Sequence, residues 1–160
     1  MSDSYNIRQA TLADMPIIVA HRHQMYEDMG AADPAIHAAF EAHFLPWLRE
    51  RLENGRYLAW FAETPAGQVV AGVGLWLQDW PPGYTDWSPF RGYILNVYTH
   101  SDHRRKGLAR LLVQTALDWC CANGIARASL HYSDQGRTLY EAMDFQHSNE
   151  MQLNLTRLSP

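Results

Sequence analysis

The sequence predicts an α+β fold in which helices cover both faces of a mixed, mostly antiparallel sheet. Short runs rich in β-branched and aromatic residues, bounded by turn residues, recur along the chain. Segments with apolar residues at helical spacing lie between these runs, in the order strand, two helices, three strands, helix, strand, helix and strand. With 160 residues, 47% hydrophobic and 19% charged, we expect one domain spanning residues 1–160.

The first strand and helix are marked by local signals. Tyr5 to Gln9 is typical of a strand. Thr11 and Asp14 have the spacing of a capping box, which predicts the start of a helix that ends near Gly30.

A second helix follows Asp33, a capping residue placed before Pro34. Its apolar residues recur every four positions: Ile36, Phe40, Phe44, Leu48 and Leu52. Pro46 removes a backbone donor inside this pattern, so we expect a kink or a break there. Asn54 and Gly55 then predict the end of the helix.

The central strands come next. Residues 56–63 and 68–78 flank a turn and predict a hairpin, and residues 93–99 predict a buried strand. After a long helix, residues 128–133 predict a short strand and 134–143 a helix. The alternation of Met151, Leu153 and Leu155 predicts a final strand.

Bulk properties exclude several classes of protein. The net charge is −4, and no apolar stretch approaches the roughly 18 residues of a membrane span. The N-terminal residues lack the basic and apolar regions of a signal peptide, so we predict a cytoplasmic protein. From the net charge and the lack of a long apolar stretch, we also predict that it binds neither nucleic acid nor membrane. The adjacent Cys120 and Cys121 suit neither a disulfide nor a metal site, and we predict no metal.

A basic, glycine-containing turn lies between the predicted strand 93–99 and the next helix. Arg104, Arg105, Lys106 and Arg110 are four of the 13 basic residues of the chain. Gly107 lets the backbone approach a ligand closely, and the N-terminus of a helix attracts phosphate. Because the basic charge is local, we expect a small anionic ligand such as a pyrophosphate.

Three motifs together resemble the GNAT superfamily of N-acetyltransferases. Arg104, Gly107 and Ala109 match its acyl-CoA signature, Arg/Gln-x-x-Gly-x-Gly/Ala. Residues 139–145 resemble its Leu-Tyr-Glu-x-x-Gly-Phe helix, with Asp144 in place of glycine. Asp tolerates the left-handed conformation that this glycine normally adopts. The opening strand and helix, with Ile7 to Thr11 and Asp14, form the third match.

The resemblance implies an α/β/α sandwich with six to seven strands and about four helices. It also implies transfer of the acetyl group of acetyl-CoA to a primary amine by direct attack in a ternary complex. The implied acceptor is a small-molecule or peptide amine, and a homodimer is possible.

The resemblance assigns cofactor contacts to two segments and one further residue. The pantetheine arm is expected along the strand, and a backbone N–H near Val97 is expected to polarise the thioester carbonyl. The implied residues are Val97, Tyr98, Thr99, Arg104, Arg105, Lys106, Gly107, Leu108, Ala109, Arg110 and Ser133.

The resemblance makes Tyr140 the general acid that protonates the leaving thiolate. A phenol with its usual pKa of about 10 is still protonated at pH 7 and can donate. The alternative is a tyrosine that only packs under the sheet. The general base stays open among five residues and a chain of water molecules. The residues are His100, Asp102 and His131 near strand ends, and Glu27 and Asp28 at the end of the first helix.

The resemblance places the acceptor site at about residues 20–44 of the first two helices and residues 79–90. The latter belong to the loop 79–92, which is dense in aromatic residues and prolines. The candidate substrate-binding residues are Glu27, Asp28, Trp80 and Tyr84. Together with Asp79 and Asp86, the acidic residues favour a cationic amine. The rings of the loop could instead cap one end of the core.

Two rival functions remain at this stage. A non-catalytic acyl-CoA sensor keeps the cofactor site but transfers nothing. A nucleic-acid-binding module needs a broad basic face, whereas this chain is acidic outside one turn.

Overall fold

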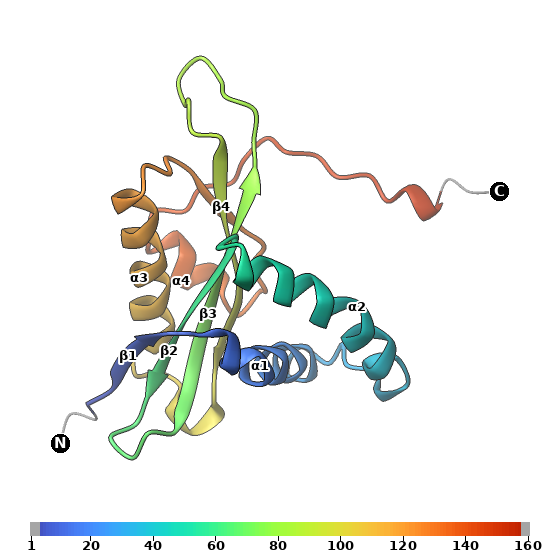
Figure 1. Cartoon of the computed structure of the whole chain (residues 1–160), viewed down its shortest axis with the longest axis vertical. Helices are drawn as coiled ribbons and strands as arrows, with labels where there is room; N and C mark the ends of the chain where they lie inside the picture. The colour runs from blue at the N-terminus through green and yellow to red at the C-terminus, as the bar shows by residue number, and fades with distance from the viewer. Residues whose placement is uncertain (1–3, 158–160) are drawn as a thin grey trace.

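The computed structural model of the chain describes residues 4–157 (Figure 1). The elements follow in this order: β1 (Asn6–Gln9), η1 (Leu12–Asp14), α1 (Met15–Asp28), α2 (Pro34–Glu53), β2 (Tyr57–Glu63), β3 (Val69–Asp79), β4 (Phe90–Thr99), η2 (Ser101–His103), α3 (Leu108–Ala122), β5 (Ala128–Leu130), α4 (Arg137–Glu141) and η3 (Leu155–Arg157). The η elements are short 3₁₀ turns. The predicted α+β class and the order of elements up to α4 are confirmed.

The strands form one mixed sheet in the order β1-β2-β3-β4-β5. Neighbouring strands from β1 to β4 are antiparallel, and β5 runs parallel to β4. The described residues therefore contribute five strands to the sheet, fewer than the expected six to seven.

The missing strand is the one predicted from the alternation at residues 151–155. Residues 146–154 have no regular secondary structure, and Leu155 begins a short 3₁₀ turn. Met151, Leu153 and Leu155 are all exposed, Met151 by 94%. Alternation predicts a strand only if one face is buried against a neighbour, and here the segment leads away from the sheet (Figure 1).

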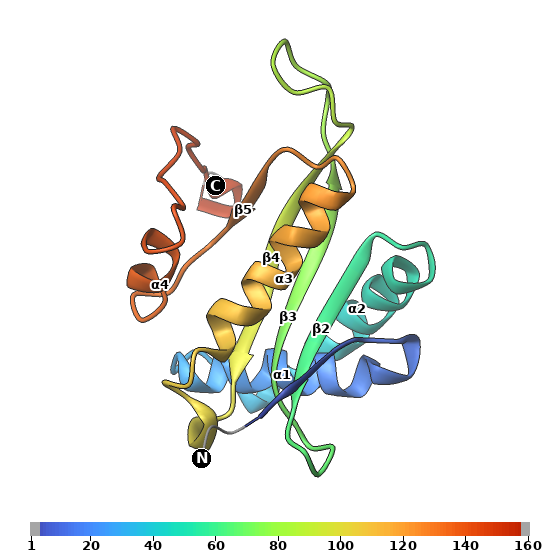
Figure 2. The same ribbon diagram turned by 90° about the vertical axis from the view of Figure 1, so that its left-hand side faces the viewer.

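Helices cover both faces of the sheet. Helices α1 and α2 lie on one face, and α3 and α4 lie on the other (Figures 1 and 2). The first face buries an apolar cluster that includes Phe44, Leu48 and Phe61. The second buries a cluster that includes Leu112 of α3 and Tyr140 of α4. Burial on two faces of one sheet gives the α/β/α layering.

Helix α2 runs unbroken through Pro46, so the expected break is absent. Pro46 lies on the exposed side of the helix, where the carbonyl that loses its partner can bond to water. On the opposite side Phe44 and Leu48 are buried against the sheet and hold the helix in place. Asp33 caps the helix as predicted, accepting a hydrogen bond from the Ala35 amide at 2.9 Å.

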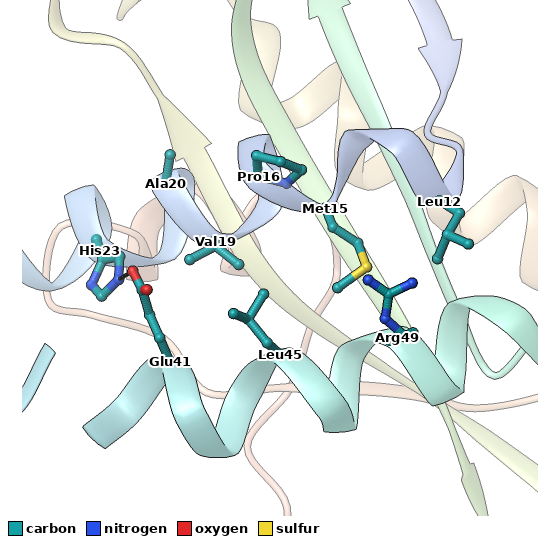
Figure 3. A pocket seen from close by; sticks show the side chains of 9 residues that line it. All are labelled: Leu12, Met15, Pro16, Val19, Ala20, His23, Glu41, Leu45 and Arg49. Atoms are coloured by element: carbon teal, nitrogen blue, oxygen red, sulfur yellow. Dashed lines mark hydrogen bonds and ion pairs between the residues drawn. The ribbon is translucent and has the colours of Figure 1, made fainter. Parts of the chain in front are cut away.

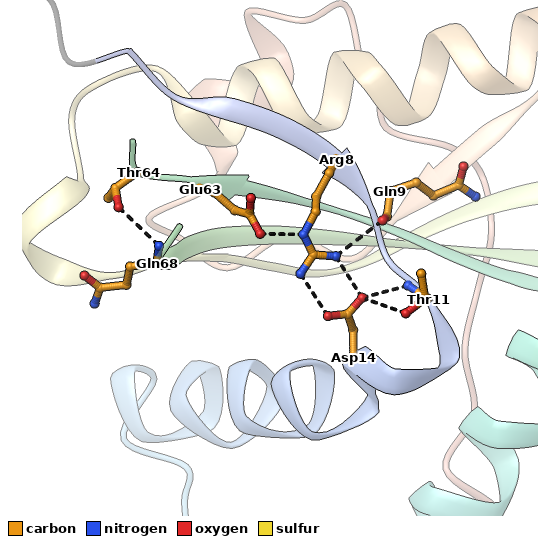
Figure 4. Close-up of polar contacts among 7 residues, drawn as sticks. All are labelled: Arg8, Gln9, Thr11, Asp14, Glu63, Thr64 and Gln68. Atoms are coloured by element: carbon orange, nitrogen blue, oxygen red, sulfur yellow. Dashed lines mark hydrogen bonds and ion pairs between the residues drawn. The ribbon is translucent and has the colours of Figure 1, made fainter. Parts of the chain in front are cut away.

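Strand β1 is tied to η1 and β2 by the side chain of Arg8 (Figure 4). Its guanidinium donates to both carboxylate oxygens of Asp14, at 2.8 and 2.9 Å, and to Glu63 at 2.5 Å. Asp14 also accepts from the Thr11 amide at 2.7 Å, which completes the predicted capping box. The hydrogen bond from Arg8 is the main cause that lowers the pKa of Asp14 to about 2.

Substituting Asp14→Asn tests this network. The folded pKa of Asp14 lies below its unfolded value, so its stabilisation is present above about pH 4 and is lost as the pH falls toward 2. We expect the substitution to lower the free energy of unfolding by about 2 kcal/mol at pH 7, and by progressively less below pH 4. Urea unfolding at several pH values measures this difference. If Asp14→Asn lowers the free energy of unfolding equally at pH 7 and pH 2.5, the account is contradicted.

Candidate functional site

The site begins where β4 and β5 separate. The two strands pair only at Gly92–Ala128, Tyr93–Ser129 and Ile94–Leu130, whereas β4 continues to Thr99. Beyond Ile94, the edge of β4 that faces β5 has no strand partner among the described residues. Figure 2 shows β5 leading away from β4 toward α4. The unpaired edge can therefore hydrogen-bond an extended ligand as an added strand does.

A β-bulge lies at the start of this unpaired edge. Two residues of β4, Asn96 and Val97, lie opposite the single Val73 of β3, and Asn96 adopts a left-handed conformation with φ of 53°. After the bulge, the His100 amide donates to the Val70 carbonyl at 2.8 Å. Backbone groups alternate in direction along a strand, so the N–H groups of Val97 and Thr99 are directed away from β3.

The basic turn has the conformation of an anion-binding loop. Arg105 and Gly107 have φ values of 64° and 80°, which turn the chain sharply into the N-terminus of α3. The first intrahelical bond runs from Leu111 to Gly107, so the amides of residues 108–110 have no acceptor within the helix. Leu108 is buried in the core and anchors the helix at this point. The predicted strand–turn–helix arrangement is confirmed.

The basic side chains of the turn have different partners. Arg104 donates to the Thr99 carbonyl at 3.0 Å and pairs with Asp28 of α1 at 2.5 Å. Arg110 donates to the Ala142 carbonyl at 3.2 Å and so links α3 to α4. Arg105 is exposed. Lys106 and Ala109, the other predicted cofactor contacts of this turn, belong to the same segment. The loop thus presents several positive charges at the end of β4.

Tyr140 of α4 has a buried ring, and the residue as a whole is 8% exposed. Its hydroxyl forms no hydrogen bond with another described residue, and the hydroxyl oxygen is not completely buried. Burial raises the pKa of Tyr140. The phenol is therefore protonated at neutral pH and able to donate to a ligand.

Ser133 lies next to this tyrosine, at the turn that begins α4. Its hydroxyl and carbonyl oxygens accept from the Gly136 amide at 3.3 and 2.9 Å. A Cβ on Gly136 would lie 3.0 Å from the Tyr140 ring, so this glycine lets the ring pack against the turn. Asp144 follows the end of α4 with φ of 65°, the left-handed conformation that the sequence predicted for it.

Comparison with known proteins agrees with this geometry. The model of the acetyltransferase (GNAT) family matches residues 21–145. The chain belongs to the GNAT family of acetyltransferases. Comparison with curated proteins gave no significant match.

Two solved structures resemble this GNAT chain over almost its whole length. A GCN5-related N-acetyltransferase from Ralstonia eutropha JMP134 is 32% identical, with a TM-score of 0.87, and the match covers 96% of this chain and 99% of that one. A predicted acetyltransferase from Clostridium acetobutylicum, solved with acetyl-CoA, is 28% identical with a TM-score of 0.84, over 96% and 98%. Acetyl-CoA is the co-substrate of this family, and the chain is an acyltransferase.

The candidate acceptor residues are not brought together. Glu27 is exposed and accepts from Gln24 at 2.9 Å, while Asp28 is paired with Arg104. Asp79 and Asp86 likewise pair with arginines, Arg56 at 2.9 Å and Arg127 at 3.7 Å. Most of the carboxylates expected to favour a cationic amine therefore already have a cationic partner.

The aromatic loop between β3 and β4 spans residues 80–89 and projects beyond the sheet, at the end of β4 opposite the basic turn (Figures 1 and 2). Tyr84 is fully exposed, and Trp80 is covered by the guanidinium of Arg91, 3.6 Å from the ring centroid. Their role in acceptor binding stays a prediction.

The candidate bases lie in three places. His100 and Asp102 are in or beside η2, after β4 ends. His131 follows β5 directly, and its Nδ1 is hydrogen-bonded to the hydroxyl of Tyr93, while its Nε2 lies 2.9 Å from the Gln152 amide nitrogen. Glu27 and Asp28, the other candidates, lie at the end of α1. Among all five residues, His131 is the one beside the strand separation.

A groove of about 490 Å³ lies between α1 and α2 (Figure 3). Its lining is mostly apolar, and a hydrogen bond between the His23 Nε2 and the Glu41 carboxylate at 2.8 Å closes one end. The lining residues are Leu12, Met15, Pro16, Val19, Ala20, His23, Glu41, Leu45 and Arg49. Ala20, His23 and Glu41 lie in the segment 20–44 where the acceptor site was expected, but none of the four candidate substrate-binding residues lines the groove.

Two negative findings apply to residues 4–157. No group of three or more histidine, cysteine or acidic residues is arranged to hold a metal ion. No helix in this part of the chain is long and apolar enough to cross a membrane.

Sequence reasoning missed a polar cluster under the β-bulge. Asn96 is 5% exposed, accepts from Arg22 at 2.6 Å and donates to the Tyr57 hydroxyl at 3.3 Å. His21 packs nearby, with its ring centroid 4.7 Å from that of Tyr98. The available signal was Asn96 itself, a polar residue in the middle of an apolar strand.

The buried His21 makes stability depend on pH. Burial lowers the pKa of His21 to about 4, whereas an unfolded histidine titrates near 6.5. The unfolded chain therefore binds a proton first, and about 2–3 kcal/mol of stability is lost as the pH falls from about 6.5 to 4. We expect His21→Leu to flatten the pH dependence of the urea midpoint in this range, and the exposed His43→Leu to leave it unchanged. If the urea midpoint depends on pH equally in the wild type, His21→Leu and His43→Leu, His21 does not have this role.

Proposed function

We propose that this acetyltransferase moves the acetyl group of acetyl-CoA to a primary amine by direct attack within a ternary complex. The main supporting observation is the arrangement of β4. Its free edge after Ile94 offers backbone donors for an extended ligand, and it leads directly to the basic turn at the N-terminus of α3. One continuous path thus fits a pantetheine arm and then a pyrophosphate.

The cofactor contacts follow from this path. The pyrophosphate binds the amides of residues 108–110 and the positive charges of Arg104, Arg105, Lys106 and Arg110. The arm pairs with the edge formed by Val97, Tyr98 and Thr99. The N–H of Val97 polarises the thioester carbonyl, because the bulge leaves it directed away from β3. Ser133 contacts the arm from the far side.

Tyr140 serves as the general acid. The amine nitrogen attacks the thioester carbon, the new C–N bond forms, and the C–S bond breaks with its electrons on sulfur. The resulting thiolate takes the phenolic proton of Tyr140, and solvent later reprotonates the phenolate. Burial of Tyr140, which raises its pKa, keeps the proton in place until the thiolate develops.

His131 is the base that we favour for the incoming amine. It lies beside the point where β4 and β5 separate, and its hydrogen bond with Tyr93 orients the ring. To accept a proton, its Nε2 exchanges the Gln152 amide for the amine or for a bridging water. A water chain can perform the same task, and the pH dependence of kcat/KM distinguishes the two.

The acceptor is a small-molecule or peptide amine. We further propose that the chain acts in the cytoplasm as a single catalytic domain and assembles as a homodimer.

Replacement of the phenolic hydroxyl tests the proposed acid. We expect Tyr140→Phe to lower kcat about 100-fold with little change in the KM for acetyl-CoA, because the ring still packs but no proton is donated. Release of CoA thiol with a panel of amines measures the rate. Tyr132→Phe, which removes a hydroxyl from an exposed ring, is the matched control.

Two outcomes argue against the proposal. Unchanged turnover in Tyr140→Phe, with chemistry shown to be rate-limiting, excludes Tyr140 as the acid. Tight CoA binding by the wild type with no thiol release from any amine supports the non-catalytic sensor instead.

A further inference from the structure

Arg22 of α1 points toward the β-bulge of β4. Its Nη1 donates to the Oδ1 of Asn96 at 2.6 Å, and its Nη2 donates to the Tyr26 hydroxyl at 3.2 Å. Three rings surround the guanidinium, those of Tyr26, Phe40 and Phe44, with centroids 5.4, 5.8 and 5.1 Å from the central carbon. These contacts fix the orientation of the charged group.

The hydrogen bonds of Arg22 are incomplete. The Nε is fully buried and has no partner, and each terminal nitrogen makes one hydrogen bond although it carries two hydrogens. Donors on all three nitrogens are therefore left without an acceptor from residues 4–157. The Nε is enclosed by the protein, so the donors that remain for an incoming anion are the second hydrogens of Nη1 and Nη2. An acceptor that binds them offsets part of the desolvation penalty of the guanidinium.

The positive charge of Arg22 also lacks a counter-ion. It forms no ion pair with a described carboxylate, in contrast to most arginines of the chain. The paired ones are Arg8, Arg49, Arg51, Arg56, Arg104, Arg127 and Arg137. Arg91 also has a buried Nε without a partner, but it lies near the beginning of β4, before the strands separate. Its guanidinium lies over the Trp80 ring in a cation–π contact.

The location of this charge relates it to the reacting groups. Asn96, which holds Arg22, directly precedes Val97, the residue proposed to bind the thioester carbonyl. Burial raises the pKa of Tyr93, the partner of His131, and this effect is opposed by the hydrogen bond with His131 and, to a smaller extent, by the positive charge of Arg22. We therefore expect an anion bound to Arg22 to lie near the bulge, one residue before the proposed thioester contact.

We propose that Arg22 binds an anionic group of the acceptor, so that the enzyme acetylates a primary amine that also carries a carboxylate or a phosphate. This inference rests on the proposed acetyl transfer and specifies the substrate class of that site. The planar guanidinium offers a bidentate fork to either anion. The anion fixes one end of the acceptor and places its amine over the thioester carbon.

Matched acceptor pairs test the substrate class. Amino acids are compared with their carboxamides, and phosphoethanolamine with ethanolamine, so that each pair differs in the anionic group and the two sets separate carboxylate from phosphate. The readout is kcat and KM for CoA thiol release. The variants are Arg22→Gln and Arg22→Lys, and Arg49→Gln is the control, because it removes an exposed positive charge from α2.

We expect the wild type to favour the anionic member of at least one pair by about 10–100-fold in kcat/KM. Arg22→Gln should abolish this preference mainly by raising the KM for the acceptor, while Arg22→Lys keeps part of it and Arg49→Gln keeps all of it. The KM for acetyl-CoA should not change. Equal use of both members by the wild type, or an unchanged preference in Arg22→Gln, overturns the inference while leaving acetyl transfer intact.

A binding measurement makes the test independent of turnover. The protein is saturated with CoA, which blocks the basic turn, and then titrated with acetate or inorganic phosphate. Tryptophan fluorescence reports binding, because Trp47 stacks on Phe44, one of the rings around Arg22.

We expect a saturable signal that weakens at least tenfold in Arg22→Gln and not in Arg49→Gln. No saturable signal in the wild type, or one unaffected by Arg22→Gln, overturns the anion site. If anions bind through Arg22 but no amine releases thiol, the anion site stands and the proposed transfer fails.

Discussion

The site depends on the free backbone edge of β4. Every buried N–H and C=O needs a partner, and β4 finds its partners in β3 along one edge and in β5 along the other only as far as Ile94. The separation of β5 leaves the remaining edge available to a ligand. The path proposed for acetyl-CoA, the position of Tyr140 and the basic turn all follow from where this edge begins and ends.

The bulge at Asn96 is supported from the sheet face that α1 covers. Its amide joins Tyr57 to Arg22, and the Tyr57 ring and the neighbouring His21 need space next to the sheet. Two glycines of β3 provide that space. A Cβ on Gly74 would lie 2.1 Å from the Tyr57 hydroxyl, and a Cβ on Gly72 would lie 2.7 Å from His21. The Gly-Val-Gly sequence of β3 is therefore explained by close packing against buried polar side chains.

Local signals in the sequence predicted most of the fold. The capping box at Thr11, the turn at Gly107 and the left-handed Asp144 each depend on a few neighbouring residues, and all three have the predicted structure. The strand at residues 151–155 was wrong, because alternation cannot show whether a neighbouring strand exists. The contacts of Arg22 could not be predicted either. They depend on a bulge in β4 that lies 74 residues away along the chain.

The central claim is that the turn between β4 and α3 binds the cofactor. Isothermal titration of acetyl-CoA into the wild type and Gly107→Trp tests it directly. Gly124→Trp is the matched control, because both glycines have positive φ and open space around them, and Gly124 lies at the other end of α3. We predict binding in the micromolar range that is abolished in Gly107→Trp and retained in Gly124→Trp. Absence of binding to the wild type, or equal binding to both variants, contradicts the account.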